Sequence, residues 1–384
     1  MSKFKKLSTL LVAAGVMFAA AFTAFADDVA LTSLSVVTAV QDGKNIPFYA
    51  NVTDYDFNVQ SDCYGVKVKA SAPAGASITI NGEEVQSGEA KIVTIDGSYA
   101  NYDIVLTTPI NVTVTKGDAS KTYTVNVIRA CDTAAYNLFK PGEYYDEANQ
   151  VNIPYELYLP SNYDPSKKYP IVFALHGSGQ RTQPLDMVLK RYQMATVWAK
   201  DSEAGINQCI VLAPQCKVTD ENTENWTTLH AYRAGVASNP YDTTKYLEGA
   251  YNLLQKVMNE YSVDKSRVYM TGLSAGGYAT YTLAIEHPDV FAAIAPDAAG
   301  ADTSKVSALK GIPMWIFQAI DDPVVKVEDA YNPTIAALQA AGVSYKTTLY
   351  DAGTVFGTSA HFSWVPMYAN KDFRNWMFAQ RKLG

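Results

Sequence analysis

The sequence predicts two domains, an all-β sandwich followed by an α/β domain with a mostly parallel sheet. Three observations favour this interpretation. Residues 27–130 contain short runs in which apolar and polar residues alternate, whereas continuous apolar runs and helical spacing alternate from about residue 135 onward. The chain of 384 residues is long enough for two domains. Its 48% hydrophobic content can fill a substantial core, which excludes wholesale disorder.

The first 26 residues are interpreted as a secretory signal peptide. Three lysines precede an uncharged apolar run over residues 10–22, and residues 24–26 form a small-x-small cleavage site. An N-terminal membrane anchor is the alternative, but the apolar run is short for a membrane span. We therefore expect cleavage near Ala26 and a secreted or periplasmic protein that does not associate with a membrane after cleavage.

The acidic balance of the chain limits its partners. Removal of residues 1–26 takes away three lysines and no acid, which lowers the formal net charge from −7 to −10. Nucleic-acid binders usually carry basic patches, so no nucleic-acid partner is expected. Electrostatic docking on anionic lipid is disfavoured for the same reason.

The four cysteines allow at most a small disulfide framework in an exported protein. Cys209 and Cys216 flank the apolar run 210–213, and a strand there, at about 3.3 Å per residue, would hold them too far apart to bond. Cys63 with Cys131 is the more plausible pair, and free buried thiols are the alternative. No cysteine pair has the spacing of a zinc site, so neither a metal nor another cofactor is expected.

In residues 27–130, strands are predicted at 55–59, 66–70, 77–80, 103–106 and 123–127, with turn signals between them. Short strands at regular spacing are typical of an antiparallel β-sandwich. The order of LTSLSV at 31–36, YDFNV at 55–59, ING at 80–82 and KTYTVNVIR at 121–129 resembles the cadherin-like or immunoglobulin-like modules of secreted bacterial proteins. Such modules are often accessory domains, and this segment contains no histidine, so the resemblance implies no chemistry.

In residues 131–384, apolar strands are predicted at 172–175, 210–213, 267–271, 291–295, 314–317 and 345–350. Helices are predicted at 247–261, from near Ala275, and at 332–341, where Asn332 is the expected N-cap and Pro333 the first helical residue. Continuous apolar strands between helices indicate a parallel sheet that is covered on both faces.

The motif GLSAG at 272–276 follows the predicted strand 267–271 and precedes a helix. This strand–turn–helix context is that of a nucleophile elbow, in which glycines avoid clashes with the neighbouring strand and helix. A glycine-rich turn with an incidental serine is the alternative. We predict Ser274 as the nucleophile and the Ala275 backbone N–H, at the helix N-terminus, as an oxyanion-hole donor.

A serine hydroxyl needs a general base, which in turn needs an orienting acid. In proteins with such an elbow the chain order is Ser, then Asp or Glu, then His. Two of the four histidines follow Ser274. His287 is interpreted as the C-cap of the helix after the elbow. His361 follows the last predicted strand and is the predicted base, with a satisfied structural histidine as the alternative.

The acid is expected directly after the strand 314–317. Asp322, which precedes the rigid Pro323, is the predicted acid, and Asp321 is the alternative. The second oxyanion donor is expected in the LHGSG segment at 175–179, where the favoured group is the Ser178 backbone N–H. His176 is predicted to support that loop rather than to act as a base.

Residues 150–380 resemble the secreted α/β-hydrolase esterases of the predicted-peptidase type, relatives of feruloyl esterases and polyhydroxybutyrate depolymerases. The resemblance rests on the order of YELYLP at 155–160, KYPIV at 168–172, HG at 176–177, APQC at 213–216, the elbow, DPVV at 322–325, His361 and Trp364. It implies Ser274, Asp322 and His361 as nucleophile, acid and base. Many relatives have His-Gly where this chain has Gln318-Ala319, which puts in doubt which aspartate acts.

These motifs favour a secreted serine carboxylesterase for feruloyl or acetyl esters of plant cell-wall polysaccharide. Trp226 and Trp364 are candidate substrate-binding residues, because aromatic faces stack on sugars and phenolic groups, and ordinary core packing is their alternative. A serine peptidase of prolyl-oligopeptidase type is the second hypothesis, although no propeller precedes the catalytic segment. A non-catalytic polysaccharide-binding or adhesion protein is the third.

Overall fold

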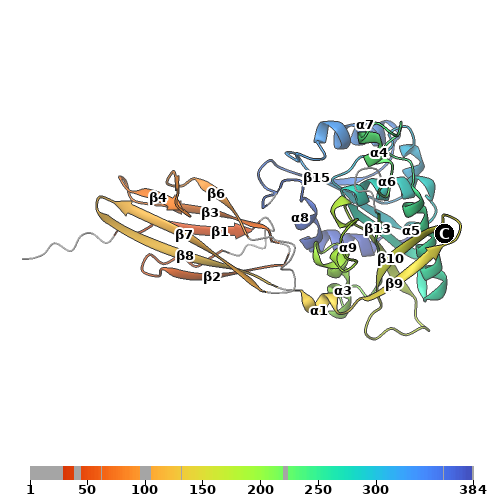
Figure 1. Ribbon diagram of the computed structural model, residues 1–384, viewed down its shortest axis with the longest axis horizontal. Coiled ribbons are helices and arrows are strands. Elements are labelled where there is room, and N and C mark those ends of the chain that lie inside the picture. Colours follow the sequence, from red (N-terminus) through yellow and green to blue (C-terminus); the bar gives the residue numbers. More distant parts are fainter. Residues whose placement is uncertain are drawn as a thin grey trace, which may run out of the picture.

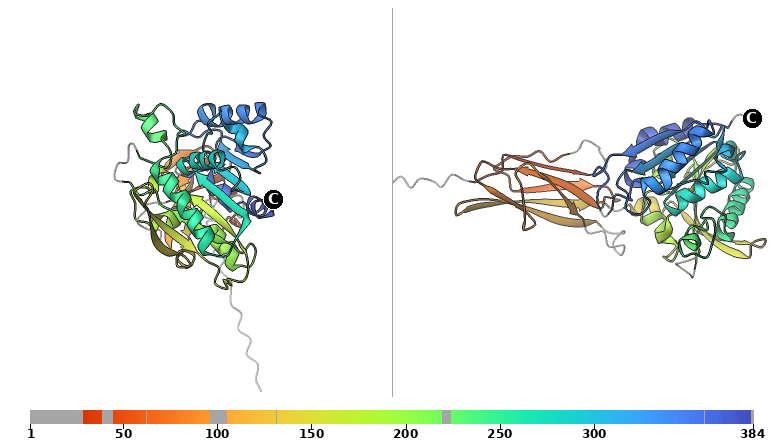
Figure 2. Two further views of the ribbon diagram at one scale, coloured as in Figure 1. Left: turned by 90° about the vertical axis from the view of Figure 1, so that its right-hand side faces the viewer. Right: turned by 90° about the horizontal axis from the view of Figure 1, so that it is seen from above.

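The computed structural model describes residues 29–38, 45–61, 63–95, 105–130, 132–218, 224–357 and 359–382. They form a β-sandwich and an α/β domain that lie end to end along the longest axis of the molecule (Figure 1). The view from above shows the same arrangement (Figure 2, right). The predicted fold class is therefore confirmed. The predicted signal peptide lies outside the described residues.

The sandwich consists of a three-stranded and a five-stranded sheet. The smaller sheet has the order β1 (Ser33–Thr38), β3 (Gly65–Ser71), β6 (Ala90–Thr94). The larger has the order β2 (Asp54–Val59), β8 (Ala119–Arg129), β7 (Leu106–Lys116), β4 (Ser77–Ile80), β5 (Glu83–Val85). The predicted antiparallel pairing holds for every described pair except β2 with β8, which is parallel. Residues 103 and 104 of the strand predicted at 103–106 lie outside the described residues, and β7 begins at Leu106.

Alternation along the strands builds the sandwich core. In β2, Tyr55, Phe57 and Val59 are buried, and the polar residues between them are exposed. Successive side chains of a strand point to opposite faces of its sheet, so the apolar set of each strand meets that of the facing sheet. The two inner faces thus share one apolar cluster, in which Ile78, Val112 and Val125 have almost no exposed surface.

The second domain is built on an eight-stranded sheet. Its order is β16 (Lys346–Tyr350), β15 (Trp315–Ala319), β14 (Ala293–Asp297), β13 (Val263–Leu273), β11 (Tyr169–Leu175), β12 (Ile210–Pro214), β10 (Val151–Tyr158), β9 (Lys140–Asp146). The strands from β16 to β12 pair in parallel, whereas β10 and β9 form an antiparallel edge. Strands β9 and β10 were not among the predicted strands, and their sequences, KPGEYYD and VNIPYELY, mix apolar and polar residues.

Helices cover both faces of this sheet. All seven residues of β11 are buried, and its alternate residues belong to two different apolar clusters. One cluster includes residues of α5 (Lys245–Glu260), α6 (Ala275–Glu286) and α7 (Asn332–Ala340). The other includes residues of α3 (Thr196–Glu203), α8 (Trp364–Ala369) and α9 (Lys371–Ala379). Short helices complete the domain: α1 (Thr133–Tyr136), α2 (Met187–Lys190) and α4 (Leu229–Arg233). Among the described residues, no helix combines the length and apolarity that crossing a bilayer requires.

Two local predictions can be compared with the structure. Asn332 is already helical, because a π-helical turn over Val327–Tyr331 runs directly into α7, so its predicted role as the N-cap is wrong. Pro333 is accordingly the second residue of α7 and not the first, as was predicted, although it still lies in the first turn. Cys209 and Cys216 are buried thiols that are not bonded to each other. Cys131 lies outside the described residues, so its pairing with Cys63 stays a prediction.

Candidate active site

Ser274 sits at a strained turn between a strand and a helix. It follows β13 and precedes α6, with φ 52° and ψ −119°. A positive φ is unfavourable for a residue with a Cβ, so the surrounding structure must hold the turn in place. The Ser274 N–H donates to the Asp297 carbonyl at 2.9 Å, and the Ser274 carbonyl accepts from the Gly277 N–H at 2.8 Å. Both hydrogen bonds fix the elbow that presents the hydroxyl.

The glycines of the motif are required by close backbone contacts. A Cβ on Gly276 would lie 2.0 Å from the Leu175 carbonyl oxygen, and one on Gly272 would lie 2.2 Å from the Gly276 carbonyl oxygen. Helix α6 therefore approaches strands β11 and β13 too closely for any side chain at either position. These close contacts explain why the motif has glycine at both positions.

The structure brings Ser274, His361 and Asp322 together. The Nε2 atom of His361 lies 3.1 Å from the Ser274 Oγ, and its Nδ1 lies 2.7 Å from the Asp322 Oδ2. The three residues follow β13, β16 and β15, at the carboxyl ends of strands in the parallel part of the sheet, with β14 between β13 and β15. Both His361 and Asp322 are buried. The arrangement links a nucleophile, a base and an orienting carboxylate by direct hydrogen bonds.

The surroundings of the two adjacent aspartates differ. The Oδ1 atom of Asp322 accepts the N–H groups of Val324 and Val325, at 2.8 and 2.9 Å, which leaves its Oδ2 to face His361. Asp321 is exposed and accepts the Gly353 N–H at 2.8 Å. Of the two alternatives left open by the sequence, only Asp322 contacts the imidazole.

Gln318 occupies the position where the sequence departs from many relatives. Its Nε2 donates to the Asp322 Oδ2 at 3.2 Å, and also to the carbonyls of Val325 and Ala319 at 3.0 and 3.2 Å. The side chain is fully buried. Gln318 therefore donates a hydrogen bond to the Asp322 carboxylate and connects the backbone of the turn after β15. Sequence reasoning missed this role, although an amide four residues before the predicted acid was a usable signal.

The segment around Ser178 approaches the elbow from β11. A Cβ on Gly177 would lie 2.7 Å from the Leu273 Cδ1 and 3.5 Å from the Ser274 Cβ, so this loop runs beside the nucleophile. Ser178 begins a short 3₁₀ turn. Ala275 is the first residue of α6, where backbone N–H groups have no acceptor within the helix. The two backbone segments predicted to form the oxyanion hole thus flank Ser274.

Two residues that carry no sequence motif anchor the Ser178 side chain. The Ser178 Oγ lies 2.8 Å from the His230 Nε2 and accepts a hydrogen bond from the Asn225 Nδ2 at 3.0 Å. His230 belongs to α4, and Asn225 precedes it in an irregular segment. Both lie about fifty residues from Ser178 in the sequence, so no local pattern could have identified them.

His176 supports its loop as a neutral imidazole, in agreement with the sequence interpretation. Burial lowers the pKa of His176 to about 3. Its Nδ1 lies 2.6 Å from the Gly177 carbonyl oxygen, and its Nε2 accepts the Cys216 N–H at 2.9 Å. Trp226 lies against this ring and donates to the His176 carbonyl at 2.9 Å. Trp226 has no exposed surface, which disagrees with its predicted place in a substrate wall.

Trp364 lies against His361. Its ring centroid is 4.9 Å from that of His361 and 5.0 Å from that of Tyr192, and only 2% of its surface is exposed. The side chain therefore packs against the imidazole from within the core. In this position it supports His361 and offers little area to a substrate.

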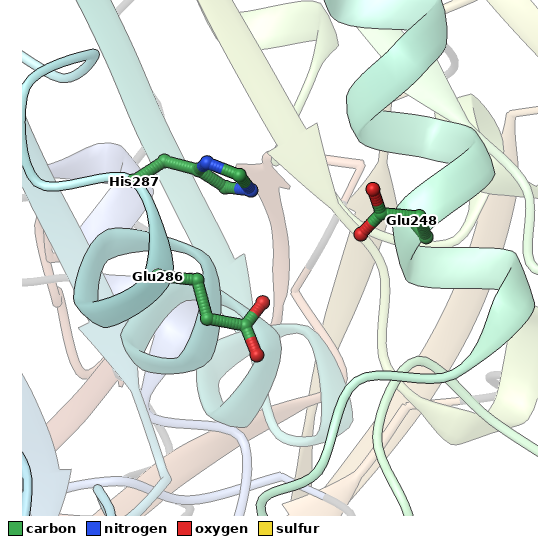
Figure 3. Close-up of side chains that lie close together, drawn as sticks. All are labelled: Glu248, Glu286 and His287. Atoms are coloured by element: carbon green, nitrogen blue, oxygen red, sulfur yellow. The ribbon is translucent and has the colours of Figure 1, made fainter.

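A second cluster of titratable groups lies at the opposite end of α6 from Ser274. Figure 3 shows Glu248, Glu286 and His287 directed toward one another, and one potential ligand atom from each lies within 4.8 Å of the others. His287 follows α6 directly, as predicted, and its ring stacks on Tyr251 with centroids 3.8 Å apart. Imidazole and carboxylate groups suit a divalent cation such as Zn²⁺. The cluster takes no part in the chemistry of the elbow.

Comparisons with known proteins agree with this geometry. The family described as "Putative esterase" matches residues 147–354, and a cadherin-like β-sandwich domain family matches residues 31–130. The chain is 32% identical over 136 residues to poly(3-hydroxyalkanoate) depolymerase C of Paucimonas lemoignei, a match that covers 34% of this chain and 28% of that protein. The match thus spans less than a third of the relative's length.

Solved structures extend the comparison to both domains. A thermostable esterase is similar over 86% of this chain and 100% of its own, with 26% identity and a TM-score of 0.61. A ferulic acid esterase is similar over 60% of this chain and 97% of its own, with 16% identity and a TM-score of 0.45. The esterase family matches more than half of the chain, over the residues that carry the elbow. The chain therefore belongs to this esterase family and is an α/β-fold hydrolase with an N-terminal cadherin-like β-sandwich domain.

Proposed function

We propose that the protein is a serine carboxylesterase in which Ser274 is the nucleophile, His361 the general base and Asp322 the orienting acid. The observation that carries the proposal is the chain of hydrogen bonds from the Ser274 Oγ through His361 to Asp322, at 3.1 and 2.7 Å. A serine hydroxyl is a weak nucleophile until an adjacent base removes its proton.

In the proposed reaction, the Ser274 Oγ attacks the ester carbonyl carbon while its proton passes to the His361 Nε2. Asp322 accepts the Nδ1–H of His361, which leaves Nε2 free to accept that proton. The backbone N–H groups of Ser178 and Ala275 stabilise the oxyanion of the tetrahedral intermediate. His361 then protonates the leaving alcohol, and a water molecule, deprotonated by the same imidazole, hydrolyses the acyl-enzyme.

We further propose that the protein is exported and acts on feruloyl or acetyl esters of plant cell-wall polysaccharide. Support comes from the signal-peptide pattern of residues 1–26 and from the resemblance of residues 150–380 to secreted esterases. Poly(3-hydroxyalkanoate) is a second candidate substrate, because the depolymerase named above shares 32% identity over 136 residues. Both candidates are esters and require the same triad.

A substrate panel tests the proposal. Hydrolysis is measured on p-nitrophenyl acetate, methyl ferulate, acetylated xylan, poly(3-hydroxybutyrate) and a proline-containing peptide, with Ser274→Ala as the control. We expect ester hydrolysis that Ser274→Ala abolishes, with methyl ferulate or acetylated xylan preferred over the polyester. Cleavage of the peptide alone would replace the esterase by a peptidase. Hydrolysis that persists in Ser274→Ala would overturn the mechanism.

A further inference from the structure

One tyrosine of the sandwich domain is buried in the core of the esterase domain. Tyr64 directly precedes β3, yet its side chain belongs to the same apolar cluster as Tyr192 and Trp364 of the esterase domain. Only 4% of its surface is exposed. Its hydroxyl donates a hydrogen bond to the Arg191 carbonyl. Tyr64 thus spans the boundary between the two domains.

The ring of Tyr64 packs against the loop that carries the general base. Its centroid lies 5.8 Å from that of Phe362, the residue after His361, at an interplanar angle of 75°. Phe362 in turn lies 4.9 Å from Trp364, and Trp364 lies 4.9 Å from the His361 ring. Ring contacts of this edge-to-face kind are favourable and directional. A continuous series of aromatic contacts therefore runs from the sandwich domain to His361.

The sandwich also contacts the segment that leads from β16 to His361. A Cβ on Gly65 would lie 2.6 Å from the Gly357 Cα, so the two backbones touch. The Lys67 Nζ donates to the Gly353 carbonyl at 2.8 Å and lies 4.7 Å from the centroid of the Phe356 ring. Strand β3 thus holds this segment on the N-terminal side of His361, while Tyr64 holds Phe362 on the other side.

A separate contact fixes the orientation of the two domains. The Asp132 carboxylate, at the junction between them, accepts hydrogen bonds from the Ser61 Oγ and from the Lys200 Nζ, the latter at 3.0 Å. Lys200 belongs to α3 of the esterase domain. Because this contact involves a different helix from the loop contacts, the sandwich is held at more than one point.

We propose that the sandwich domain is a structural part of the active site and that Tyr64 is a positioning residue for His361. The proposal rests on the proposed roles of Ser274 and His361. A general base must lie within hydrogen-bonding distance of the proton that it removes, and a displacement of about 1 Å can cost on the order of 100-fold in rate. In this proposal Tyr64 acts on His361 through Phe362.

Kinetics of three variants test the proposal: Tyr64→Ala, Tyr64→Phe, and Ile78→Ala as a matched control. Ile78 is buried in the sandwich core within β4. We expect Tyr64→Ala to lower kcat on p-nitrophenyl acetate by about 10- to 100-fold, with KM changed by less than about threefold, because the base is displaced while the binding surface remains. Tyr64→Phe retains the ring and is expected to restore most of kcat, and Ile78→Ala is expected to leave kcat unchanged.

Amide hydrogen exchange of residues 359–368 provides a readout that needs no substrate. Exchange there should increase in Tyr64→Ala and remain at the wild-type rate in Tyr64→Phe and Ile78→Ala. If Tyr64→Ala does not fold, Tyr64→Leu supplies the same comparison.

Unchanged kcat and unchanged exchange in Tyr64→Ala would overturn the proposal, as would an equal fall in kcat in Ile78→Ala. A wild-type protein without esterase activity would refute the proposed function, and the exchange data would still decide the role of Tyr64.

Discussion

The two domains use their strands in opposite ways, and the difference determines where the chemistry lies. In the sandwich strand β2, buried and exposed residues alternate, whereas every residue of β11 in the esterase domain is buried. Parallel strands that are covered on both faces end at a common edge, where their following loops meet. That edge brings together Ser274, Asp322 and His361. His361 hydrogen-bonds to Asp322, which lies 39 residues before it, and to Ser274, which lies 87 residues before it. The described sandwich strands, which are mostly antiparallel, create no such edge.

The two domains also differ in the number of ionisable side chains that are buried in them. Among the described residues, every buried acidic or histidine side chain lies in the esterase domain, including Glu156, Asp297 and Asp322. The sandwich core is almost entirely apolar. We therefore expect both activity and its pH dependence to follow substitutions in the esterase domain, whereas the sandwich affects activity only through its contacts with the catalytic loop.

The largest expected effect distinguishes two neighbouring aspartates. Asp322→Asn removes the carboxylate that holds the Nδ1–H of His361, and kcat should fall on the order of 10⁴-fold. Asp321→Asn is the matched control, and kcat should stay within about twofold because this exposed side chain contacts only loop backbone. Steady-state kinetics on p-nitrophenyl acetate measure both. Equal losses in the two variants would contradict the assignment of the acid.

The second prediction concerns stability and pH. Burial and the nearby Asp186 carboxylate raise the pKa of Glu156 from 4.5 to about 7. The folded state therefore binds the proton more tightly than the unfolded state, so this group lowers stability as pH rises from about 4.5 to 7, by at most about 3 kcal/mol. Glu156→Gln should remove that part of the pH dependence. Urea unfolding at pH 5 and pH 7.5 measures it, and an identical pH dependence in both proteins would refute the prediction.

A smaller effect is expected from the residue that orients the acid. Gln318→Leu removes the Nε2 donor to Asp322 and to the Val325 carbonyl while keeping a similar volume. We expect kcat to fall about 10-fold with little change in KM, because the acid remains present but is held less firmly. Gln339→Leu, on the exposed surface of α7, is the control and should not change kcat. A kcat of wild-type magnitude in Gln318→Leu would show that backbone N–H groups suffice to position the carboxylate.

The smallest effect should come from the exposed part of the domain boundary. Lys67→Gln removes the charge over Phe356 and weakens the contact with the Gly353 carbonyl. Exposed contacts of this kind contribute little, so kcat should change by less than about twofold. The kcat of Lys67→Gln is compared with that of Tyr64→Ala. The comparison tests whether the buried Tyr64 ring, rather than the surface contact of Lys67, links the sandwich to His361. A larger loss in Lys67→Gln than in Tyr64→Ala would reverse that conclusion.

Much of this architecture could be predicted from the sequence, because the informative signals are local. The apolar run before Gly272 and the small-residue helix after Ser274 identify the elbow. Chain order limits the base to His287 or His361, and the position of His361 after the last predicted strand selects it. Alternation in residues 55–59 and 123–127 predicts sandwich strands. These patterns reflect which residues of one segment are buried, consecutive ones in the parallel sheet and alternate ones in the sandwich, and both are visible in a single segment.

The remainder depends on contacts between distant segments. The choice between Asp321 and Asp322 follows from how the turn after β15 folds back on Gln318. The anchoring of Ser178 by His230 spans 52 residues, and the packing of Tyr64 on Phe362 crosses the domain boundary. The β9–β10 edge was not predicted, and Lys140–Asp146 contains few apolar residues. In each case the physical cause is tertiary packing, which no local pattern encodes.

Covalent labelling tests the central claim most directly. A fluorophosphonate reacts with an activated serine hydroxyl, and mass spectrometry of the digested protein identifies the modified residue. We predict one label per chain, on Ser274, with loss of ester hydrolysis in proportion to labelling and no label in Ser274→Ala or His361→Ala. A stoichiometric label on another residue, or full activity after Ser274 is modified, would contradict the assignment of the active site.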